Sequence, residues 1–437
     1  MQDMENQFVK TAAKCYFMAI AVLMYYFLTE ALNLGLFVSY RHAFALLLVA
    51  STFLAFLYKP NIARCVSSIT STLMYCIPAF VTVLVSLFIW FVGQVDTEVI
   101  SRGLSSTFVY TNMLSCALAA VAFLYVFGEK GIWYNLVAIL ISNLIKILVI
   151  IAQNGIGSFF NEFITLIITF ADQTGDIIVQ AEIHELAFCI GAYLIYMLLK
   201  PKKNIVFFIL LGLAVFCFLT SFKRIGMIAI VIALGLGWML NLVAKLKKET
   251  ARSLVIILSV LLIVILMGYI VIIKLDVFSM LEAAGINTSG RVIVYNAVDK
   301  FYEISPDFIG HGIGFLSYQL NTNMSVGVLA VHNDFLQYYI DLGFWGYILW
   351  LASMTLVRVG YFGSKGKIDS AIITLALTVY LFIVSSTDNT VNYPLFTTTL
   401  AIIMIGHGFD DRVRASEVKM FGCVSEANKE TEGESML

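Results

Sequence analysis

Long apolar stretches, separated by short polar segments, dominate the chain. Leu254–Ile273 and Ile225–Val243 are apolar over about 20 residues, the length that an α-helix needs to cross a bilayer. Membrane β-strands would alternate polar and apolar residues, and these stretches do not. We therefore predict an all-α polytopic membrane protein with about 12 transmembrane helices. The predicted spans are residues 12–32, 43–58, 69–92, 108–127, 133–151, 183–199, 205–220, 225–243, 254–273, 335–357, 372–385 and 394–406. The last two are short, which leaves eleven spans as the alternative.

The composition supports a membrane protein and argues against several other classes. Of the 437 residues, 60% are hydrophobic and 13% are charged, whereas a soluble domain carries about 25% charged residues. The net charge of −1 and the lack of a dense basic cluster argue against nucleic-acid binding. The seven cysteines show no metal-binding spacing, so we expect them to be structural. We expect no cofactor and no metal site.

The distribution of basic residues predicts the orientation, because cytoplasmic loops of membrane proteins are enriched in Lys and Arg. With a cytoplasmic N-terminus, the inside segments hold nineteen Lys and Arg residues and the outside segments hold seven, while Lys146 lies within a span. This bias predicts an even number of spans and two cytoplasmic termini. Residues 1–11 would be a cytoplasmic N-terminus, residues 12–410 the bundle, and residues 411–437 a disordered cytoplasmic tail.

Two longer segments are predicted on the outer side, Gln153–Glu182 and Leu275–Asp334. We expect the second to lie as a lid on the outer face of the bundle. Within it, Val294, Val298 and Phe301 fall at helical spacing, which predicts a short amphipathic helix. Thr288 or Ser289 could cap this helix. Arg291 would occupy its first turn, where free backbone amides also attract anions.

Few outer residues are cationic, and those few are candidates for binding phosphate, since guanidinium groups bind phosphate bidentately. Lys223 and Arg224 lie in a tight turn between two spans. The alternative is that these two side chains only extend their charged groups to the membrane interface and bind no ligand. Arg102, in the predicted outer loop Val95–Ser106, could touch glycan or phosphate, and a structural role is the commoner explanation of such a residue. For Arg291, the alternative is an ordinary surface arginine.

Two further motifs lie near the end of the large outer segment. Pro306 is followed by Gly310, Gly312 and Gly314, and alternate glycines permit close approach of the backbone to a ligand. A turn without a ligand is the commoner explanation of such glycines.

The second motif lies where the chain re-enters the membrane. His332, beside Asn333 and Asp334, is a candidate general base there. Other ionisable residues predicted on the outer side, His184 with Glu185 and also Asp388, are expected to be structural.

The ordered set of motifs resembles the O-antigen polymerase and O-antigen ligase superfamily, the Wzy and WaaL-like membrane glycosyltransferases. The set covers about residues 221–346. It consists of Arg224, Ser289-Gly290-Arg291 followed by Tyr295, Pro306 with its glycines, His332-Asn333, and Leu342-Gly343-x-x-Gly346. Tyr295 stands where the family commonly has tryptophan. The proline-to-glycine spacing is about one residue longer than in the family, and Lys-Arg replaces the plain Ser-Arg of the outer turn.

The resemblance implies a transferase that acts on undecaprenyl-diphosphate-linked oligosaccharide at the outer leaflet of the bacterial plasma membrane. We expect a polymerase of repeat units into surface polysaccharide (O-antigen, capsule or exopolysaccharide) that needs no metal. His332 would be the general base, and Arg291 and Arg224 would bind the diphosphate leaving group. The expected substrate-binding residues are Lys223, Arg102, Tyr295, Gly312, Gly314 and Asn333. A chain-length regulator and a flippase are possible partners, together with membrane lipid.

Two other functions compete with the polymerase. The first is an O-antigen ligase, which transfers glycan to lipid A–core and differs mainly in its acceptor. The second is a transporter or flippase for lipid-linked oligosaccharide, and the intramembrane Lys146 favours it. Transporters often show paired repeats with broken helices at the bilayer midplane. The sequence shows no such duplication, and its candidate cations lie toward the outer surface.

Overall fold

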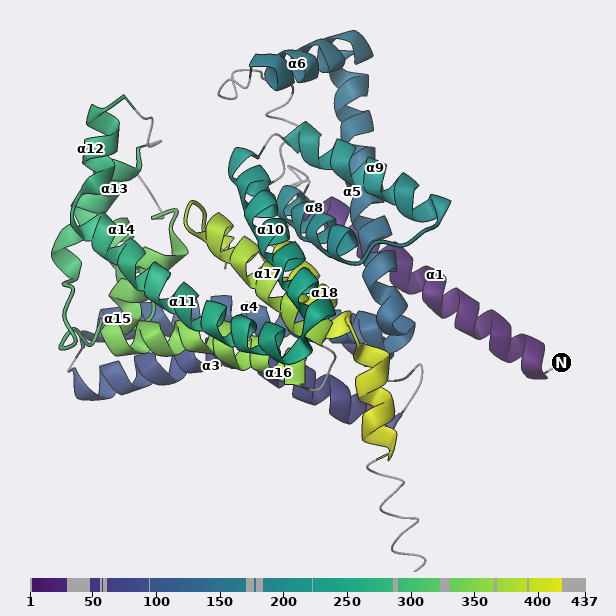
Figure 1. Ribbon diagram of the computed structural model, residues 1–437, viewed down its shortest axis with the longest axis horizontal. Helices are drawn as coiled ribbons and strands as arrows, with labels where there is room; N and C mark the ends of the chain where they lie inside the picture. Colours follow the sequence, from purple (N-terminus) through teal and green to yellow (C-terminus); the bar gives the residue numbers. More distant parts are fainter. Residues whose placement is uncertain are drawn as a thin grey trace, which may run out of the picture.

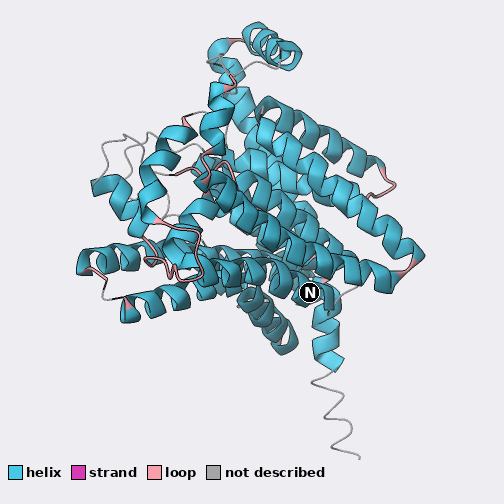
Figure 2. Ribbon diagram, turned by 60° about the vertical axis from the view of Figure 1, so that its left-hand side comes forward, coloured by secondary structure: helices cyan, strands magenta, loops and turns pink. Residues whose placement is uncertain are grey.

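Helices make up nearly all of the described chain in the computed structural model (Figure 2). The structure describes residues 2–29, 48–55, 57, 61–93, 95–169, 177, 184–221, 223–285, 290–322, 331–364, 368–390 and 393–418. Within these residues there is no β-strand. The predicted all-α class is therefore confirmed.

The long helices form one bundle in which segments far apart in sequence lie side by side (Figure 1). They are α1 (Gln2–Thr29), α3 (Ile62–Val92), α4 (Thr97–Phe127), α5 (Gly131–Asn154), α8 (His184–Leu199), α9 (Ile205–Ser221), α10 (Arg224–Leu246), α11 (Lys248–Lys274), α15 (Asp334–Ala352), α17 (Ile368–Ser385) and α18 (Pro394–Gly406).

The predicted spans agree with these helices. Every predicted span coincides with a described helix, except the second, for which only residues 48–55 and 57 are described. Six apolar segments of the described chain are long enough to cross a membrane, and the shorter apolar helices include α8, α9 and α18. On α10 and α11, apolar side chains such as Val231 (70% exposed) and Val264 (60% exposed) face outward. Such surfaces need lipid as their solvent, so the chain is a multi-pass membrane protein.

Several helices extend beyond the predicted spans. The helix α3 begins at Ile62 rather than residue 69, and α4 begins at Thr97 rather than residue 108. Each has 31 residues, which corresponds to about 46 Å, whereas the hydrocarbon core is about 30 Å thick. The predicted outer loop Val95–Ser106 is thus largely the first turns of α4, which Asp96 caps by accepting a hydrogen bond from the Glu98 amide.

The helix α15 is broken near its middle and continuous at its end. At Gly343 the backbone has φ 71° and ψ −177°, which is not helical. Beyond Ala352 the helix continues through one π-helical turn, η3 (Ser353–Val357), into α16 (Arg358–Ser364). The predicted span 335–357 is therefore correct in position, but Arg358 lies inside a continuous helix rather than in a loop.

The segment between α11 and α15, which the sequence predicts on the outer side and which we call the outer segment, is folded onto the bundle, as expected for a lid. It contains α12 (Val277–Ala283), α13 (Arg291–Val298), the 3-10 turn η2 (Asp299–Phe301) and α14 (Phe315–Thr322), which lie together beside the start of α15 (Figure 1). Buried residues of this segment, including Val298 and Leu316, share one apolar cluster with Ile270 of α11 and Phe335 of α15. This cluster fixes the outer segment against the two helices.

Two segments have more structure than their composition predicted. The segment Gln153–Glu182, also predicted on the outer side, contains α6 (Ile156–Thr169), an apolar helix that projects from the end of α5 (Figure 1). Helix also continues over residues 409–418, so the predicted disordered tail from residue 411 is wrong for its first eight residues. Arg412 holds this part by donating to the carbonyls of Ile405 and His407. Residues 419–437 lie outside the described part.

Candidate functional site

Arg291 begins helix α13, as predicted. Gly290, with φ 74°, provides the left-handed turn that leads into it, a conformation that favours glycine. Val294 and Val298 are buried, which confirms the predicted apolar stripe. The suggested caps Thr288 and Ser289 lie outside the described residues.

The half-buried Arg291 side chain reaches the turn after α17. Its Nη2 donates to the Thr387 carbonyl oxygen at 3.1 Å. This contact joins the large outer segment to a turn almost 100 residues later in the sequence.

His332 faces the same turn. Its Nδ1 lies 3.9 Å from Asp388 Oδ1, and its side chain is 58% exposed, whereas that of Asp388 is 15% exposed. The structure therefore brings Arg291 and His332, two of the three predicted catalytic residues, to neighbouring residues of one turn. Asp388, which is expected from the sequence to be structural, lies beside the candidate base.

The carboxylate of Asp388 is held in place from two directions. Oδ1 accepts hydrogen bonds from the Tyr393 hydroxyl at 2.7 Å and from the Asn389 amide at 2.9 Å. Burial, assisted by the charge of Asp388, raises the pKa of Tyr393, so its hydroxyl stays protonated and remains a donor. A carboxylate fixed in this way can orient an imidazole and stabilise its protonated form.

The backbone at His332 is strained. Its φ of 51° lies in the left-handed region, which costs a residue with a side chain about 1–2 kcal/mol. Strain of this kind persists where the surroundings impose it and is common at functional sites. Here Val331 is buried on one side and Asn333 caps α15 on the other, so the chain turns sharply and leaves the imidazole exposed.

Asn333 is fully buried and uses its whole amide within the protein. Its Oδ1 accepts from the amides of Phe335 and Leu336, and its Nδ2 donates to the hydroxyls of Tyr269 and Tyr295, all within 3.2 Å. The two bonds from Oδ1 cap α15, and the two from Nδ2 fix the residue next to His332 to both α11 and α13. Such contacts favour a positioning role for Asn333 and Tyr295, whose buried hydroxyl has a raised pKa because of desolvation.

A second connection ties the start of α15 to the turn after α17. The buried Asp334 accepts a hydrogen bond from the Thr390 hydroxyl at 2.8 Å, and Thr390 also contacts Ser385 at the end of α17. The residues on both sides of Asn333 thus face one turn, which contains Asp388 and Thr390. This arrangement fixes His332 relative to Asp388 more firmly than one contact would.

The glycine-rich loop binds the bundle through its own backbone. The amides of His311 and Gly312 donate to the Asp341 carbonyl, and those of Gly314 and Leu316 donate to its carboxylate, at 2.7–3.4 Å. Ser86 Oγ accepts from the Ile313 amide at 3.0 Å. These amides are therefore engaged within the protein, which favours a structural role for Gly312 and Gly314 over a phosphate cradle.

Asp341 was not identified from the sequence. It is 1% exposed and lies in the second half of the first α15 segment, just before the break at Gly343. The signal available was a carboxylate inside an apolar span, which is costly unless it is hydrogen-bonded. The close approach of the glycine-rich loop to α15 also needs a glycine at position 343, because a Cβ on Gly343 would lie 2.2 Å from the backbone carbonyl carbon of Ile309.

We expect Gly312→Ala to destabilise the fold strongly. Gly312 has φ +85°, and an added Cβ would lie 2.0 Å from Trp90 Nε1. The strained backbone would cost about 1–2 kcal/mol and the steric overlap about 1–3 kcal/mol more. Thermal unfolding of the purified protein in detergent would measure the loss.

Two other glycines are matched controls for Gly312→Ala. Gly285 has φ +85° with open space around it, so its alanine variant should show the backbone cost alone. Gly235 has open space and no positive φ, so its alanine variant should be close to wild type. Equal stability of all three variants would contradict the packing of the glycine-rich loop against Trp90.

His311 is a half-buried histidine in the same loop. Burial lowers its pKa from the usual 6.5, against the smaller opposing effect of its bond to Phe301. The ring nitrogen Nε2 lies 2.9 Å from the Phe301 carbonyl oxygen, and the ring stacks on Phe315 at 3.9 Å. The ring can donate in this contact in either protonation state, so it is the partial burial of the ring that favours the uncharged form in the folded loop.

The lowered pKa predicts a pH dependence of stability. Since the unfolded state binds a proton more readily, stability should be complete above about pH 6.5 and fall as the pH drops toward the lower folded-state pKa. In His311→Gln, which keeps an N–H donor but does not titrate, this part of the loss should disappear. Melting temperatures between pH 5 and 8 would test it, and identical slopes for both proteins would refute it.

Arg224, the third predicted catalytic residue, is exposed at the first position of α10. The C-terminal end of α10, at Lys245, shares a groove with the N-terminal end of α17, at Ile368 and Asp369. The two helices pack against each other and so run antiparallel. Arg224 therefore lies at the same end of the bundle as Ser385, Thr387 and Asp388.

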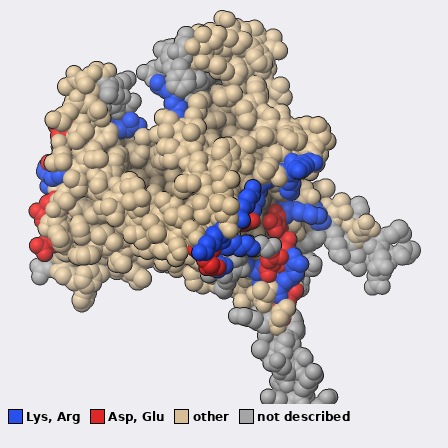
Figure 3. Space-filling model, in the orientation of Figure 1, with Lys and Arg blue, Asp and Glu red and all other residues tan. Residues whose placement is uncertain are grey.

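Figure 3 shows basic side chains on both sides of the hollow that separates the α12–α14 region from the upper end of α10. Lys223, the residue before Arg224, is half-buried at the start of α10. This arrangement would expose an anion in the hollow to positive charge from two directions.

The side chain of Arg102 lies outside the described part of the structure, but its backbone is in α4. The next residue, Gly103, packs closely against Trp90 and against the Ile313 carbonyl, since a Cβ there would lie 2.4 Å from that oxygen. Arg102 thus comes from a helix that touches the glycine-rich loop, rather than from a free outer loop as predicted.

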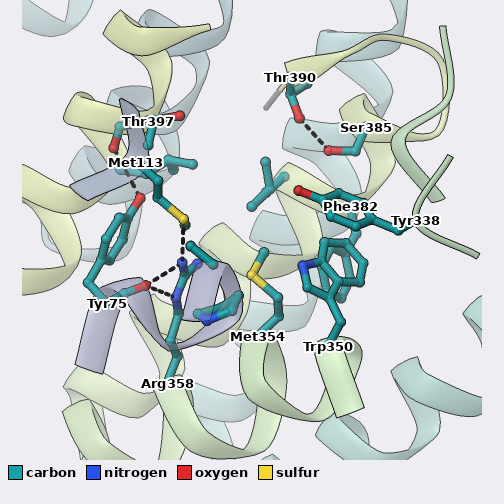
Figure 4. Close-up of a pocket in the computed structure, with 14 residues that line it drawn as sticks. Tyr75, Met113, Tyr338, Trp350, Met354, Arg358, Phe382, Ser385, Thr390 and Thr397 are labelled. Atoms are coloured by element: carbon teal, nitrogen blue, oxygen red, sulfur yellow. Dashed lines mark hydrogen bonds between the residues drawn. The ribbon is translucent and has the colours of Figure 1, made fainter. Parts of the chain in front are cut away.

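A buried arginine lies beneath the turn. Arg358 was expected as a cation in an inside loop, but it is 1% exposed and lines a cavity of about 50 Å³ (Figure 4). Its Nε donates to the Tyr75 carbonyl at 2.8 Å, and its guanidinium lies 4.2 Å from the centre of the Tyr75 ring. Ser385 and Thr390 line the same cavity. Beyond the break at Gly343 the helix is continuous from α15 into α16, and this continuity packs Arg358 against α3 instead of exposing it to water.

In the part of the chain that the structure describes, no three His, Cys, Asp or Glu side chains gather closely enough to hold a metal ion. The charged groups described at the site are the cations Arg291, Arg224 and Lys223, the carboxylate of Asp388 beside His332 and that of Asp334 at the start of α15.

Comparison with known proteins identifies one segment. Residues 205–351 match a family model described as O-antigen ligase. This segment contains Arg224, Arg291 and His332, and its match confirms the resemblance to the O-antigen polymerase and ligase superfamily. The enzymes of this family are membrane glycosyltransferase-like. No curated protein matches the chain.

Proposed function

We propose that this chain, whose residues 205–351 match the O-antigen ligase family, polymerises undecaprenyl-diphosphate-linked oligosaccharide repeats into surface polysaccharide. The reaction would occur at the outer leaflet of the bacterial plasma membrane. The observation that carries the proposal is the convergence of Arg291 and His332 on the Thr387–Asp388 turn. A cation for the leaving group and a base for the acceptor are then within reach of one substrate.

The reaction requires one bond to form as another breaks. The acceptor hydroxyl oxygen bonds to the anomeric carbon of the donor glycan, and the bond from that carbon to the lipid diphosphate breaks. The bonding pair leaves with the diphosphate, and the hydroxyl proton passes to His332. A single displacement of this kind inverts the anomeric carbon.

Asp388 and the arginines would assist different parts of this step. With Nδ1 of His332 facing Asp388, Nε2 of the exposed ring is available to the acceptor hydroxyl, and the carboxylate stabilises the imidazolium that forms. Arg291 and Arg224 would bind the diphosphate and stabilise the charge that develops on it. A diphosphate is already a good leaving group, so no residue has to protonate it.

We also propose that the reaction needs no metal, because the arginines can neutralise the diphosphate. The test is a transfer assay with purified protein and lipid-linked repeats in the presence of EDTA. Full activity is the expected result. Activity that EDTA removes and Mg²⁺ restores would contradict the metal-independent mechanism.

A ligase is the second candidate, because the matching family model is described as O-antigen ligase. The same residues would act, but the acceptor would be lipid A–core. In proteoliposomes that contain only lipid-linked repeats, a polymerase should produce a ladder of longer glycans, whereas a ligase should leave the repeats unchanged until lipid A–core is added. Flippase and chain-length regulator partners would show as changes in the length distribution of this ladder.

We propose that both termini face the cytoplasm. The support is the basic bias of the inside segments and the position of Lys200, Lys245 and Arg252 at the end of α17 opposite Ser385. Labelling of single cysteines in intact cells tests this. Cysteines placed at Lys203 should be shielded from impermeant reagents and those at Lys300 should react, and the reverse pattern would contradict the orientation.

A further inference from the structure

We propose that the protein binds an anionic phospholipid in a groove at the end of the bundle opposite His332. This basic groove has a volume of about 1040 Å³ and lies between α8, α10, α11 and α17. Its lining includes Lys200, Trp238, Leu242, Lys245, Lys248 and Arg252. Figure 3 shows the basic and acidic side chains gathered at this end of the molecule.

The basic groove has an excess of positive charge. Four cationic side chains line it, against the single carboxylate of Asp369. Asp369 pairs with Lys200, and Glu249 pairs with Arg252 at 2.8 Å. Among the described residues, Lys245 and Lys248 have no carboxylate within 4 Å. These two exposed lysines are the part of the groove that is available to an anion.

The groove also has an apolar wall beside its cations. Trp238 (50% exposed) and Leu242 (62% exposed) precede Lys245 on α10 by seven and three residues, so they lie on the same helix face. The indole Nε1 of Trp238 donates to the Leu198 carbonyl at 3.4 Å, which holds the ring across α8 and α10. Tryptophan and lysine at the end of a spanning helix mark the level of the lipid headgroups.

This combination matches a phospholipid better than a soluble anion. A phosphate between Lys245 and Lys248 would place the attached acyl chain along Leu242 and Trp238, toward the outward-facing surface of α10. A soluble phosphate would use only the lysines and leave the apolar wall exposed. Basic pockets between transmembrane helices are typical binding sites of anionic lipid headgroups, and the volume is large enough for a sizeable ligand.

The proposal does not rest on the transferase activity and can be tested without it. Purified full-length protein in a zwitterionic detergent would be titrated with phosphatidylglycerol or with phosphatidylcholine, and binding followed by native mass spectrometry and by melting temperature. Phosphatidylglycerol should bind and raise the melting temperature, whereas phosphatidylcholine should not. Equal effects of the two lipids would overturn the proposal even if no variant could be purified.

A pair of double variants locates the site. Lys245→Gln with Lys248→Gln should weaken phosphatidylglycerol binding at least about tenfold, because each lysine near a membrane surface contributes substantially to binding anionic lipid. The matched control is Lys203→Gln with Lys247→Gln. It removes the same charge from two exposed lysines of the same end that do not line the groove, so its affinity should stay within about twofold of wild type.

Two results would overturn the assignment. One is equal weakening by both double variants, which would mean that general charge attracts the lipid. The other is a melting-temperature rise with inorganic diphosphate, at matched ionic strength, as large as that with phosphatidylglycerol. That result would identify the ligand as a soluble phosphate compound instead of a lipid.

Discussion

His332→Ala should abolish glycan polymerisation while the protein still folds and inserts in the membrane. Removing a general base costs about 10²–10⁴-fold in rate. We expect a loss near 10⁴-fold, because the ring of His311 contacts Phe301 and that of His407 contacts Glu129, so neither can replace His332 at the Thr387–Asp388 turn. The exposed imidazole makes few packing contacts, so the melting temperature should change little. Cells that carry the variant should display one repeat unit instead of long polymer.

The control for His332→Ala is the same change at His407, which lies 3.6 Å from Glu129 at the opposite end of the bundle. Transfer by that variant should continue. Asp388→Asn should give an intermediate loss, because it keeps the shape of the side chain but removes the charge that stabilises the imidazolium. Long polymer made by His332→Ala cells would refute the assignment of this residue as the base.

Arg291→Ala should reduce transfer by about 10²–10³-fold, the usual cost of losing a group that stabilises developing negative charge. Arg291→Lys should also be damaging, because the ammonium of lysine cannot bind phosphate with two parallel hydrogen bonds. The bond from Arg291 to Thr387 would be lost as well, which frees the turn that holds Asp388. Initial rates with defined lipid-linked repeats would measure both effects.

Lys300→Ala is the matched control for Arg291. Lys300 is an exposed cation in the same outer segment, positioned over the Phe301 ring, and its removal changes the net charge equally. Transfer by Lys300→Ala should stay near the wild-type rate. If Lys300→Ala and Arg291→Ala lowered the rate equally, Arg291 would contribute only to the general charge of the outer surface.

The two site predictions together distinguish the mechanism from a purely structural defect. The His332 variant should lose transfer without losing stability, and the Arg291 variants should lose transfer with only the small loss of stability that one hydrogen bond to Thr387 implies. Gly312→Ala should instead lose stability first. The distinction follows from the contacts. His332 is 58% exposed, but an added Cβ at Gly312 would meet Trp90 at 2.0 Å.

The sequence alone determined the membrane class, the positions of the spans and the helix at Arg291. These features depend on local properties of the chain. A run of apolar residues needs lipid around it wherever the helix packs, and the spacing of Val294 and Val298 fixes one apolar face. The family could also be recognised, because its motifs follow one another in order along the chain.

The residues that the motif residues contact could not be predicted from the neighbouring sequence, because they lie far away along the chain. The glycine-rich loop has the composition of a phosphate cradle, but Asp341, about 27 residues further on, accepts several of its amides. Asp388 comes beside His332 only because α15 begins close to the turn at which α17 ends. Arg358 resembles a loop cation until the continuous helix places it against the Tyr75 carbonyl.

The sequence therefore determined which segments of this protein lie in the membrane. The tertiary structure decided which polar groups contact each other. The first depends on solvation of single helices, which is additive along the chain. The second depends on contacts such as Arg291 with Thr387, 96 residues apart. Such contacts arise from the packing of the bundle, and in an apolar interior each buried polar group must find a partner.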